Sequence, residues 1–260
     1  EFTVVAAAVV GALGGARALP VPVAIALRDK QKQKNLIRAA GLPTARSATA
    51  DTAADITDTA LKVGGYPIVV KPLAGAGARD TVRLSSANEA ATWANGQPHT
   101  GPWLVEEFIT GAEYHVDGVI RNGQLLTCAV SRYLHNLIDV HDGALVGSVC
   151  LTPDEHPDLY RTAEHLTTHA LAALNHTDGV FHLEAFRQPD NTLIFGECAG
   201  RVGGGRIDQV VRHSFGTDLH DHWAAAALNT PAPPKHPTEG GTLGFVHLTA
   251  QAGVIESMPT

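Results

Sequence analysis

The stretch from residue 64 to residue 84, GGYPIVVKPLAGAGARDTVRL, limits the fold more than any other part of the chain. The β-branched residues of its first half predict a strand over 66–72, and a second strand is expected from Thr81. Small residues over 74–80 predict a loop between the strands, whose backbone can approach a large ligand and present N–H groups to phosphates. A flexible hairpin tip explains the same residues, so the loop alone does not distinguish a phosphate-binding loop from an ordinary hairpin.

Composition limits the class of protein and the class of partner. The 260 residues, 44% hydrophobic and 17% charged, are typical of a globular protein with one large core or two smaller ones. The net charge of −7 argues against a nucleic-acid partner. The three cysteines show no CxxC spacing, which disfavours a structural zinc site or a disulfide framework and favours the reducing cytoplasm.

The chain opens on an apolar run, TVVAAAVVGALGGA. This run has no basic region before it and is too short and too interrupted by glycine to span a membrane, so no membrane partner is expected. We expect residues 1–27 to form an alanine- and valine-rich helix and a short strand that ends in the Pro-Val-Pro segment. This opening and the abrupt C-terminus indicate a fragment of a longer protein or a trimmed chain.

Most of the other strands are expected in pairs, with helices between the pairs. The Asn122-Gly123 turn predicts a hairpin of strands 113–120 and 124–132, and a second antiparallel pair is expected over 180–187 and 192–198. Periodicity and turn residues predict the remaining elements: helices over 28–40, 51–63, 88–95, 157–174, from 207 and over 218–228, and strands over 103–108 and 244–249. Hairpins separated by helices predict an α+β fold.

Several common nucleotide-binding and catalytic motifs are missing. The glycine-rich loop lies between two strands and has Asp80 where a Rossmann fingerprint needs its third glycine. The Gly-Lys-Ser/Thr ending of a Walker loop is also missing. Protein kinases close a loop over phosphates from a hairpin, but this chain contains no HRD or DFG triplet. The G-x-S-x-G elbow of serine hydrolases does not occur either.

Two glutamates lie within otherwise apolar strands. Alternation places Glu184 on the same face as His182, and Glu197 on the same face as Phe195. A carboxylate is rarely buried unless a partner compensates it, and a Mg²⁺ ion that bridges phosphates is such a partner. Glutamates that face solvent are the alternative.

Two further groups of polar residues stand out. Arg201 and Arg206 flank the triple glycine 203–205, a combination that suits a phosphate or carboxylate clamp and equally a mobile loop with solvated arginines. Alternation puts Glu113, His115 and Asp117 on one strand face, which is either a ribose-binding edge or a polar sheet surface.

Taken in this order, the pieces resemble the ATP-grasp superfamily and, within it, the carboxylate–amine ligases. The resemblance covers residues 28–260 and rests on the Asp-Lys pair at 29–30 before a helix that ends at AAG, on GYPIVVKP with the small-residue loop, and on VEEFITGAEYHVD, HLEAF and E-x-x-x-R before GGG. It implies an α+β, ATP-grasp fold in which two subdomains hold a nucleotide between antiparallel sheets. These would be residues 28–105, with the glycine-rich loop as a lid, and residues 106–260, with the start of a C-terminal segment. Residues 1–27 would be the tail of an N-terminal α/β domain.

The resemblance also implies roles for individual residues. Glu106 would accept from the adenine amino group, the backbone of 107–109 would form the hinge edge, and Glu113 would hold the ribose hydroxyls. Lys30 and Lys71 would contact the nucleotide phosphates, and Arg201 would stabilise the transferring phosphoryl group or the acyl phosphate. The implied nucleotide-binding set is Lys30, Lys71, Gly75, Gly77, Arg79, Glu106, Glu107, Phe108, Ile109, Glu113 and Arg132, the implied metal ligands are Glu184 and Glu197, and the implied catalytic set is Arg201, Lys71 and Arg206.

The activity implied is that of an ATP- and Mg²⁺-dependent ligase, which joins a carboxylate, expected to be an amino acid, to an amine through an acyl phosphate and forms ADP. Small molecules are the expected partners, and a homodimer is an open alternative to a monomer. A nucleotide-binding module that has lost catalysis is a rival, as is a carbon–nitrogen ligase of nucleotide metabolism.

Two positions depart from the family pattern. Ala199 stands where the family commonly has asparagine, which leaves one ligand of a second Mg²⁺ to be supplied by water. Asp80 stands where a glycine is usual, and its charge must turn away from the phosphates if the loop covers ATP.

Overall fold

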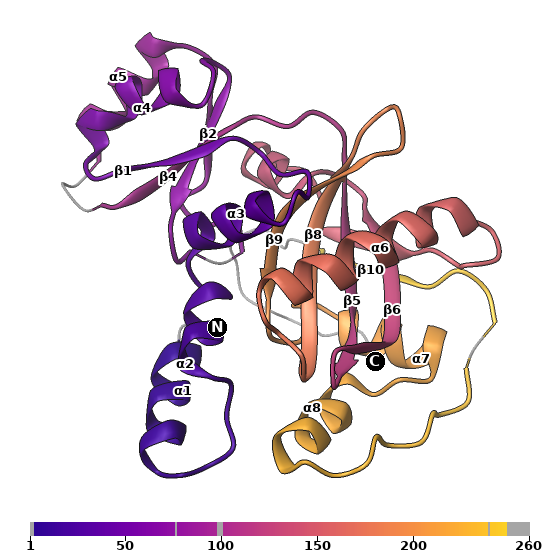
Figure 1. The fold of residues 1–260 in the computed structure, drawn as a ribbon. Coiled ribbons are helices and arrows are strands. Elements are labelled where there is room, and N and C mark those ends of the chain that lie inside the picture. Colours follow the sequence, from indigo (N-terminus) through magenta and orange to yellow (C-terminus); the bar gives the residue numbers. More distant parts are fainter. Residues whose placement is uncertain (1–2, 76, 98–100, 239, 249–260) are drawn as a thin grey trace, which may run out of the picture.

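The computed structural model describes residues 3–75, 77–97, 101–238 and 240–248, and among these it contains two antiparallel sheets (Figure 1). The smaller sheet has the strand order β1-β4-β2-β3, and the larger has the order β10-β7-β6-β5-β8-β9. The strands of the smaller sheet are β1 (Ser47–Ala50), β4 (Trp103–Glu107), β2 (Ile68–Pro72) and β3 (Val82–Leu84). Those of the larger are β10 (Gly244–Val246), β7 (Gly147–Cys150), β6 (Gln124–Tyr133), β5 (Ala112–Arg121), β8 (Gly179–Arg187) and β9 (Leu193–Ala199).

The smaller sheet packs one face against helices α4 (Ile56–Lys62) and α5 (Ala87–Asn95), at the upper left of Figure 1. Ile68 and Val70 on β2 are completely buried in this small core. Because side chains alternate along a strand, Val69 and Lys71 point to the opposite face. That face looks toward the larger sheet and carries part of a cavity between the two.

The larger sheet has a different cover on each face. Helix α6 (Pro157–Ala173) buries an apolar stripe that includes Leu166 and Ala170 against side chains of β5, β6, β8 and β9. Helices α7 (Ile207–Phe215) and α8 (Leu219–Leu228) cover part of the other face (Figure 1), where Ile207 and Leu219 join a separate small core. The uncovered part of that second face is therefore available to a ligand.

Helix α3 (Lys30–Ala39) lies between the two sheets and contacts β1 and β9 (Figure 1). Asp29 caps its first turn by accepting from the Lys32 N–H at 2.9 Å. Gln33 ties the helix to the larger sheet through two bonds with the backbone of Cys198, at 2.7 and 2.9 Å. These bonds hold the N-terminal turn of α3 at the edge of the cavity.

The α+β class and the hairpin pairing confirm the sequence interpretation, since all the strand pairs in both sheets are antiparallel. The prediction of a short strand within residues 1–27 was wrong. Two helices occupy that segment, α1 (Val4–Leu13) and α2 (Val21–Ala26). The Pro-Val-Pro segment begins α2, because a proline in the first helical turn lacks only an N–H that has no partner in the helix.

Two strands and one short helix were missed. β1 and β7 are only four residues long and carry no clear apolar alternation, and the 3₁₀ helix Leu137–Asp142 follows the β5–β6 hairpin. The last strand ends at Val246, and residue 249 of its expected range lies outside the described residues. Among the described helices, none combines the length and hydropathy that a membrane crossing needs.

Candidate active site

A cavity of about 280 Å³ lies between the two sheets and receives side chains from both. Its walls come from α3, β2, the glycine-rich loop, the end of β4, and the facing parts of β5, β8 and β9. Thirteen of the predicted site residues line it: Lys30, Lys71, Gly75, Gly77, Arg79, Glu106, Glu107, Phe108, Ile109, Glu113, Glu184, Glu197 and Arg201.

The floor of the cavity is a cluster of buried lysines and glutamates. Glu106 receives Lys71 Nζ on Oε1 at 2.6 Å and Lys34 Nζ on Oε2 at 3.1 Å. Glu197 Oε2 receives Lys30 Nζ at 3.0 Å and lies 3.8 Å from Lys71 Nζ. Burial opposes the ionisation of Glu106, but the two lysines lower its pKa to about 2. The cluster therefore gathers three buried lysines in one wall of the cavity, and lysine side chains are common partners of phosphates.

Lys34 was missed by the sequence interpretation. Its side chain is 3% exposed, and burial lowers its pKa while Glu106 acts in the opposite direction. Lys34 lies four residues after Lys30 and three before the completely buried Ile37, so all three share one face of α3. That helical spacing is the signal that could have identified it.

The glycine-rich loop is fastened to the start of α3. Gly75 O accepts from Lys30 Nζ at 3.1 Å and from Arg28 Nη1 at 2.9 Å, and Ala74 O also accepts from Arg28. Asp80 has φ +56°, a left-handed conformation that aspartate tolerates better than most residues with a side chain. Its side chain is exposed and does not line the cavity, as a covering loop requires.

The segment expected to form the hinge edge, residues 107–109, lies where β4 ends. The Glu107 carboxylate accepts from Arg46 N at 2.7 Å and from Arg46 Nε at 2.8 Å, while Phe108 N donates to Pro67 O at 3.1 Å. These bonds hold the segment against the smaller sheet. The Glu106 carboxylate points instead at the lysines, so the structure places it among the cations and not as a free acceptor at the hinge.

Glu113 lies on β5 at the opposite wall. Its carboxylate accepts from Leu137 N at 2.7 Å, and its own N–H donates to Asn136 Oδ1 at 3.0 Å. Burial, together with the neighbouring charge of Glu184, raises its pKa to about 8. A carboxyl that holds its proton near neutral pH can donate as well as accept a hydrogen bond.

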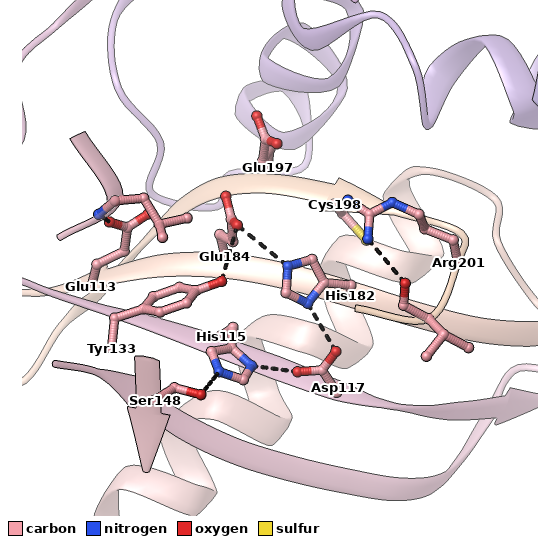
Figure 2. A network of polar contacts seen from close by, with 12 residues as sticks. Glu113, His115, Asp117, Tyr133, Ser148, His182, Glu184, Glu197, Cys198 and Arg201 are labelled. Carbon is pink, nitrogen blue, oxygen red and sulfur yellow. Dashed lines mark hydrogen bonds and ion pairs between the residues drawn. The ribbon is translucent and has the colours of Figure 1, made fainter. Parts of the chain in front are cut away.

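Glu184 and Glu197 oppose each other across β8 and β9, as Figure 2 shows. The expectation that Glu197 shares a face with Phe195 was wrong. A register shift next to Glu184 makes β9 bulge at Gly196, so Phe195 is buried in the α6 core and Glu197 faces the cavity. Gly196 is needed there, because a Cβ would come within 2.8 Å of Glu184 O.

Arg201 follows β9 (Figure 2), and its Nη1 donates to Val202 O at 2.9 Å. It also lines a second cavity of about 530 Å³, which α1, the segment after it, α8 and the turn before β8 enclose. Arg201 is thus a wall shared by the two cavities.

Arg132 and Arg206 are not brought to either cavity. Arg132 is exposed and alternates with Ser131 and Tyr133, whose side chains lie on the cavity face of β6, so it points to the opposite face. Arg206 is exposed at the N-terminus of α7.

The chain matches known proteins over most of its length. Residues 64–209, more than half of the chain, match the family described as the ATP-grasp domain. An L-arginine-specific L-amino acid ligase of Bacillus subtilis is 27% identical over 241 residues, covering 90% of this chain and 57% of that protein. The chain thus spans less than two thirds of that relative.

Solved structures of other proteins share the fold. The L-amino acid ligase from Bacillus licheniformis has a TM-score of 0.70 and 22% identity, over 85% of this chain and 52% of its own. The carboxyaminoimidazole ribonucleotide synthase of Aspergillus clavatus, solved with ATP, also has a TM-score of 0.70, with 19% identity over 83% of this chain and 55% of its own.

Proposed function

The chain belongs to the ATP-grasp family, and from this premise we propose that it is an ATP-dependent ligase, which joins the carboxylate of an amino acid to an amine and forms ADP and phosphate. The observation that carries the proposal is the cavity floor, where Lys30, Lys34 and Lys71 stand beside the opposed pair Glu184 and Glu197. Cations with facing carboxylates suit a metal–triphosphate complex better than an apolar ligand.

We assign the nucleotide to this cavity with its base toward the hinge edge. Phe108 and Ile109 supply apolar wall there, and Glu113 lies where its carboxyl can meet ribose hydroxyls. The phosphates would extend to Lys30 and Lys71, beneath the loop that Gly75 and its neighbours form. Support comes from the fact that all of these residues line the same cavity.

The residues present fit a Mg²⁺ ion. Glu184 and Glu197 are opposed oxygen donors in one cavity, and Glu184 Oε2 has no partner among the described residues. Carboxylate oxygens with room for water are the ligands that Mg²⁺ prefers. Ala199 adds no oxygen from its side chain, so water would complete the shell. When bound, Mg²⁺ neutralises and orients phosphate oxygens.

The first chemical step would be attack by a substrate carboxylate oxygen on the γ-phosphorus. The new O–P bond forms as the bond to the β–γ bridging oxygen breaks, and ADP leaves. Lys71 and Arg201 hold the charge on the moving group, and the loop excludes water that would otherwise hydrolyse the acyl phosphate. Arg201 suits this place because it lines both the nucleotide cavity and its neighbour.

In the second step the amine would attack the acyl carbon. The C–N bond forms, phosphate leaves with the former carboxylate oxygen, and the amine gives up a proton. Neither step needs a covalent nucleophile from the protein, and the three cysteines of the chain are all buried and do not line the cavity. Arg206 and Arg132 have no part in either step as the structure places them.

A nucleotide-metabolism ligase is the second candidate, because the Aspergillus structure shares the fold at an equal TM-score. Release of phosphate should be measured against a matrix of amino acids and against amino-imidazole ribonucleotides. Phosphate release that needs two amino acids together supports the proposal. Release of phosphate with the ribonucleotides alone would support the second candidate. Binding of ATP without formation of ADP would indicate a nucleotide-binding module without catalysis.

The Glu197→Gln variant tests the assignment of the metal. Gln keeps the size of the side chain and an acceptor for Lys30 but loses the charge. We expect a folded protein whose Mg²⁺-dependent turnover falls at least a hundredfold, by the same phosphate assay. Full activity in this variant would show that Glu197 is not a metal ligand.

For the compartment we propose the cytoplasm, where ATP and free amino acids are both abundant.

A further inference from the structure

A chain of buried polar side chains runs under the cavity and ends on Glu184, and Figure 2 shows its course. It crosses the larger sheet from β7 through β5 to β8. Ser148, His115, Asp117 and His182 are each no more than 6% exposed. Polar groups this deep in a sheet need a reason, because burial is costly unless each one is paired.

The chain is continuous in hydrogen bonds. Ser148 Oγ lies 2.8 Å from His115 Nε2, and His115 Nδ1 bonds to Asp117 Oδ2. Asp117 Oδ1 lies 2.8 Å from His182 Nδ1, and His182 Nε2 lies 3.3 Å from Glu184 Oε1.

The direction of each bond follows from the chemistry of the end groups. Carboxylates only accept, so both ring nitrogens of His182 donate, one to Asp117 and one to Glu184. His115 likewise donates from Nδ1 to Asp117, and its Nε2 accepts from the Ser148 hydroxyl. These hydrogen bonds therefore connect Ser148, on one side of the sheet, to the carboxylate of Glu184 at the cavity.

Both donors to Glu184 meet the same oxygen. Tyr133 Oη donates to Oε1 at 3.4 Å, beside the bond from His182. The carboxylate is thus held by one oxygen, and Oε2 is the oxygen left toward the cavity. Two donors on one oxygen fix the rotation of the carboxylate more firmly than one.

The triple glycine after β9 closes over this chain. A Cβ on Gly203 would come within 2.8 Å of Asp117 Oδ1 and 2.9 Å of His182 Nδ1. The loop therefore lies directly on the bond between these two side chains, which excludes water from it.

We propose that Ser148, His115, Asp117 and His182 act as a positioning chain, which fixes Glu184 with Oε1 occupied and Oε2 presented to the metal. The inference rests on the proposed function, since it takes Glu184 as a metal ligand. Partners behind a metal ligand commonly set its affinity for the ion by orienting it.

Binding of Mn²⁺ in the presence of ADP tests the positioning chain without relying on turnover. Electron paramagnetic resonance measures this binding, because the signal of free Mn²⁺ is lost when the ion binds. We expect Asp117→Asn to weaken Mn²⁺ binding about tenfold or more. Ser148→Ala, a milder change at the far end, should weaken it about two- to fivefold.

Thr127→Val is the matched control for Ser148→Ala. It removes another buried hydroxyl from the same sheet, one that bonds to Thr217 Oγ1 at 2.9 Å and takes no part in the chain. Thermal melting should show both variants destabilised, while only Ser148→Ala changes the affinity for Mn²⁺. Equal weakening by both would overturn the proposal, because it would indicate general loosening of the sheet.

The outcomes separate the inference from its premise. If the unaltered protein with ADP binds no Mn²⁺, the proposed function fails. If it binds Mn²⁺ and Glu184→Gln weakens binding while Asp117→Asn and Ser148→Ala do not, only the positioning chain fails. If Glu184→Gln has no effect, Glu184 is not a ligand and the inference falls. Should Asp117→Asn not fold, Ser148→Ala decides.

Discussion

The charge balance of the cavity floor depends on single residues. Glu106 sits between Lys34 and Lys71 and neutralises part of their charge before any phosphate arrives. This arrangement lowers the cost of burying two lysines, and Lys30 adds a third cation, which pairs with Glu197. A phosphate entering the cavity would meet lysines that the carboxylates already hold in place.

Lys34→Met tests this balance. Met fills a similar volume without the charge, so the affinity for MgATP should fall about tenfold. A loss of this size is expected when a positive charge that attracts the phosphates is removed. Titration calorimetry gives the dissociation constant. Lys32→Met on the same helix is the control, because Lys32 is exposed. Equal affinities in the two variants would show that Lys34 only supports the fold.

Glu113 leads to a pH-dependent stability. Its pKa is raised to about 8 in the folded protein, whereas the unfolded chain ionises it near 4.5. The unfolded state therefore binds fewer protons between these values, and stability falls as pH rises from about 4.5 to about 8. Glu113→Gln should remove this pH dependence, which corresponds to on the order of 5 kcal/mol over the whole range, while Gln can still accept from Leu137 N–H.

Chemical denaturation of the nucleotide-free protein at several pH values measures this slope. His182 acts in the same direction at higher pH, because burial opposes its charge but Asp117 raises its pKa to about 10. The difference between the unaltered protein and Glu113→Gln isolates the glutamate. Parallel profiles for the two proteins would contradict the assignment.

At the level of elements, the bulge in β9 decides which side chains reach the cavity. Gly196 allows the backbone to approach Glu184 O, and the extra residue turns Glu197 over to the face that Glu184 occupies. Without it, strict alternation would send Glu197 into the core under α6.

Gly196→Ala should therefore do more than a usual glycine-to-alanine change. The new methyl group would overlap Glu184 O, and we expect a loss of about 2 kcal/mol in the free energy of unfolding. Gly240→Ala, where no atom lies within 4 Å of the added Cβ, serves as the control and should stay within about 0.5 kcal/mol. Denaturant unfolding compares the two, and an unchanged stability for Gly196→Ala would refute the role of the bulge.

Sequence patterns predicted those elements in which local and tertiary preferences agree. The Asn122-Gly123 turn has positive φ at both residues and joins β5 to β6 as expected. The bulge at Gly196 could not be predicted from the alternation of side chains along β9, because a register shift depends on the partner strand. Lys34 was overlooked because a lysine in a polar helix usually faces water, and its burial follows only from the packing of α3 between the sheets.

At the level of the whole molecule, the cavity proposed for the nucleotide draws its walls from both sheets, and α3 touches both. A ligand that fills the cavity should therefore stabilise the protein as a unit. At 100 times its dissociation constant, MgATP should add about 2.7 kcal/mol to the free energy of unfolding, seen as a higher melting temperature. No shift at that saturation would contradict a site shared by the two sheets.

The division of the chain at residues 27 and 105 stays a prediction, as does the pairing of two copies. The second cavity, which Arg201 also lines, lies next to the place that we propose for the phosphates. Substrate specificity is therefore best sought among the residues that line it and in the segment 135–147, which contributes to the first cavity.

The central claim is that the carboxylate of an amino acid attacks ATP. An amino acid labelled with ¹⁸O in both carboxylate oxygens, incubated with a second amino acid, MgATP and the purified protein, tests it most directly by mass spectrometry of the phosphate released. The account predicts one ¹⁸O atom in each phosphate formed. Phosphate that carries no label while ADP accumulates would contradict the acyl-phosphate mechanism.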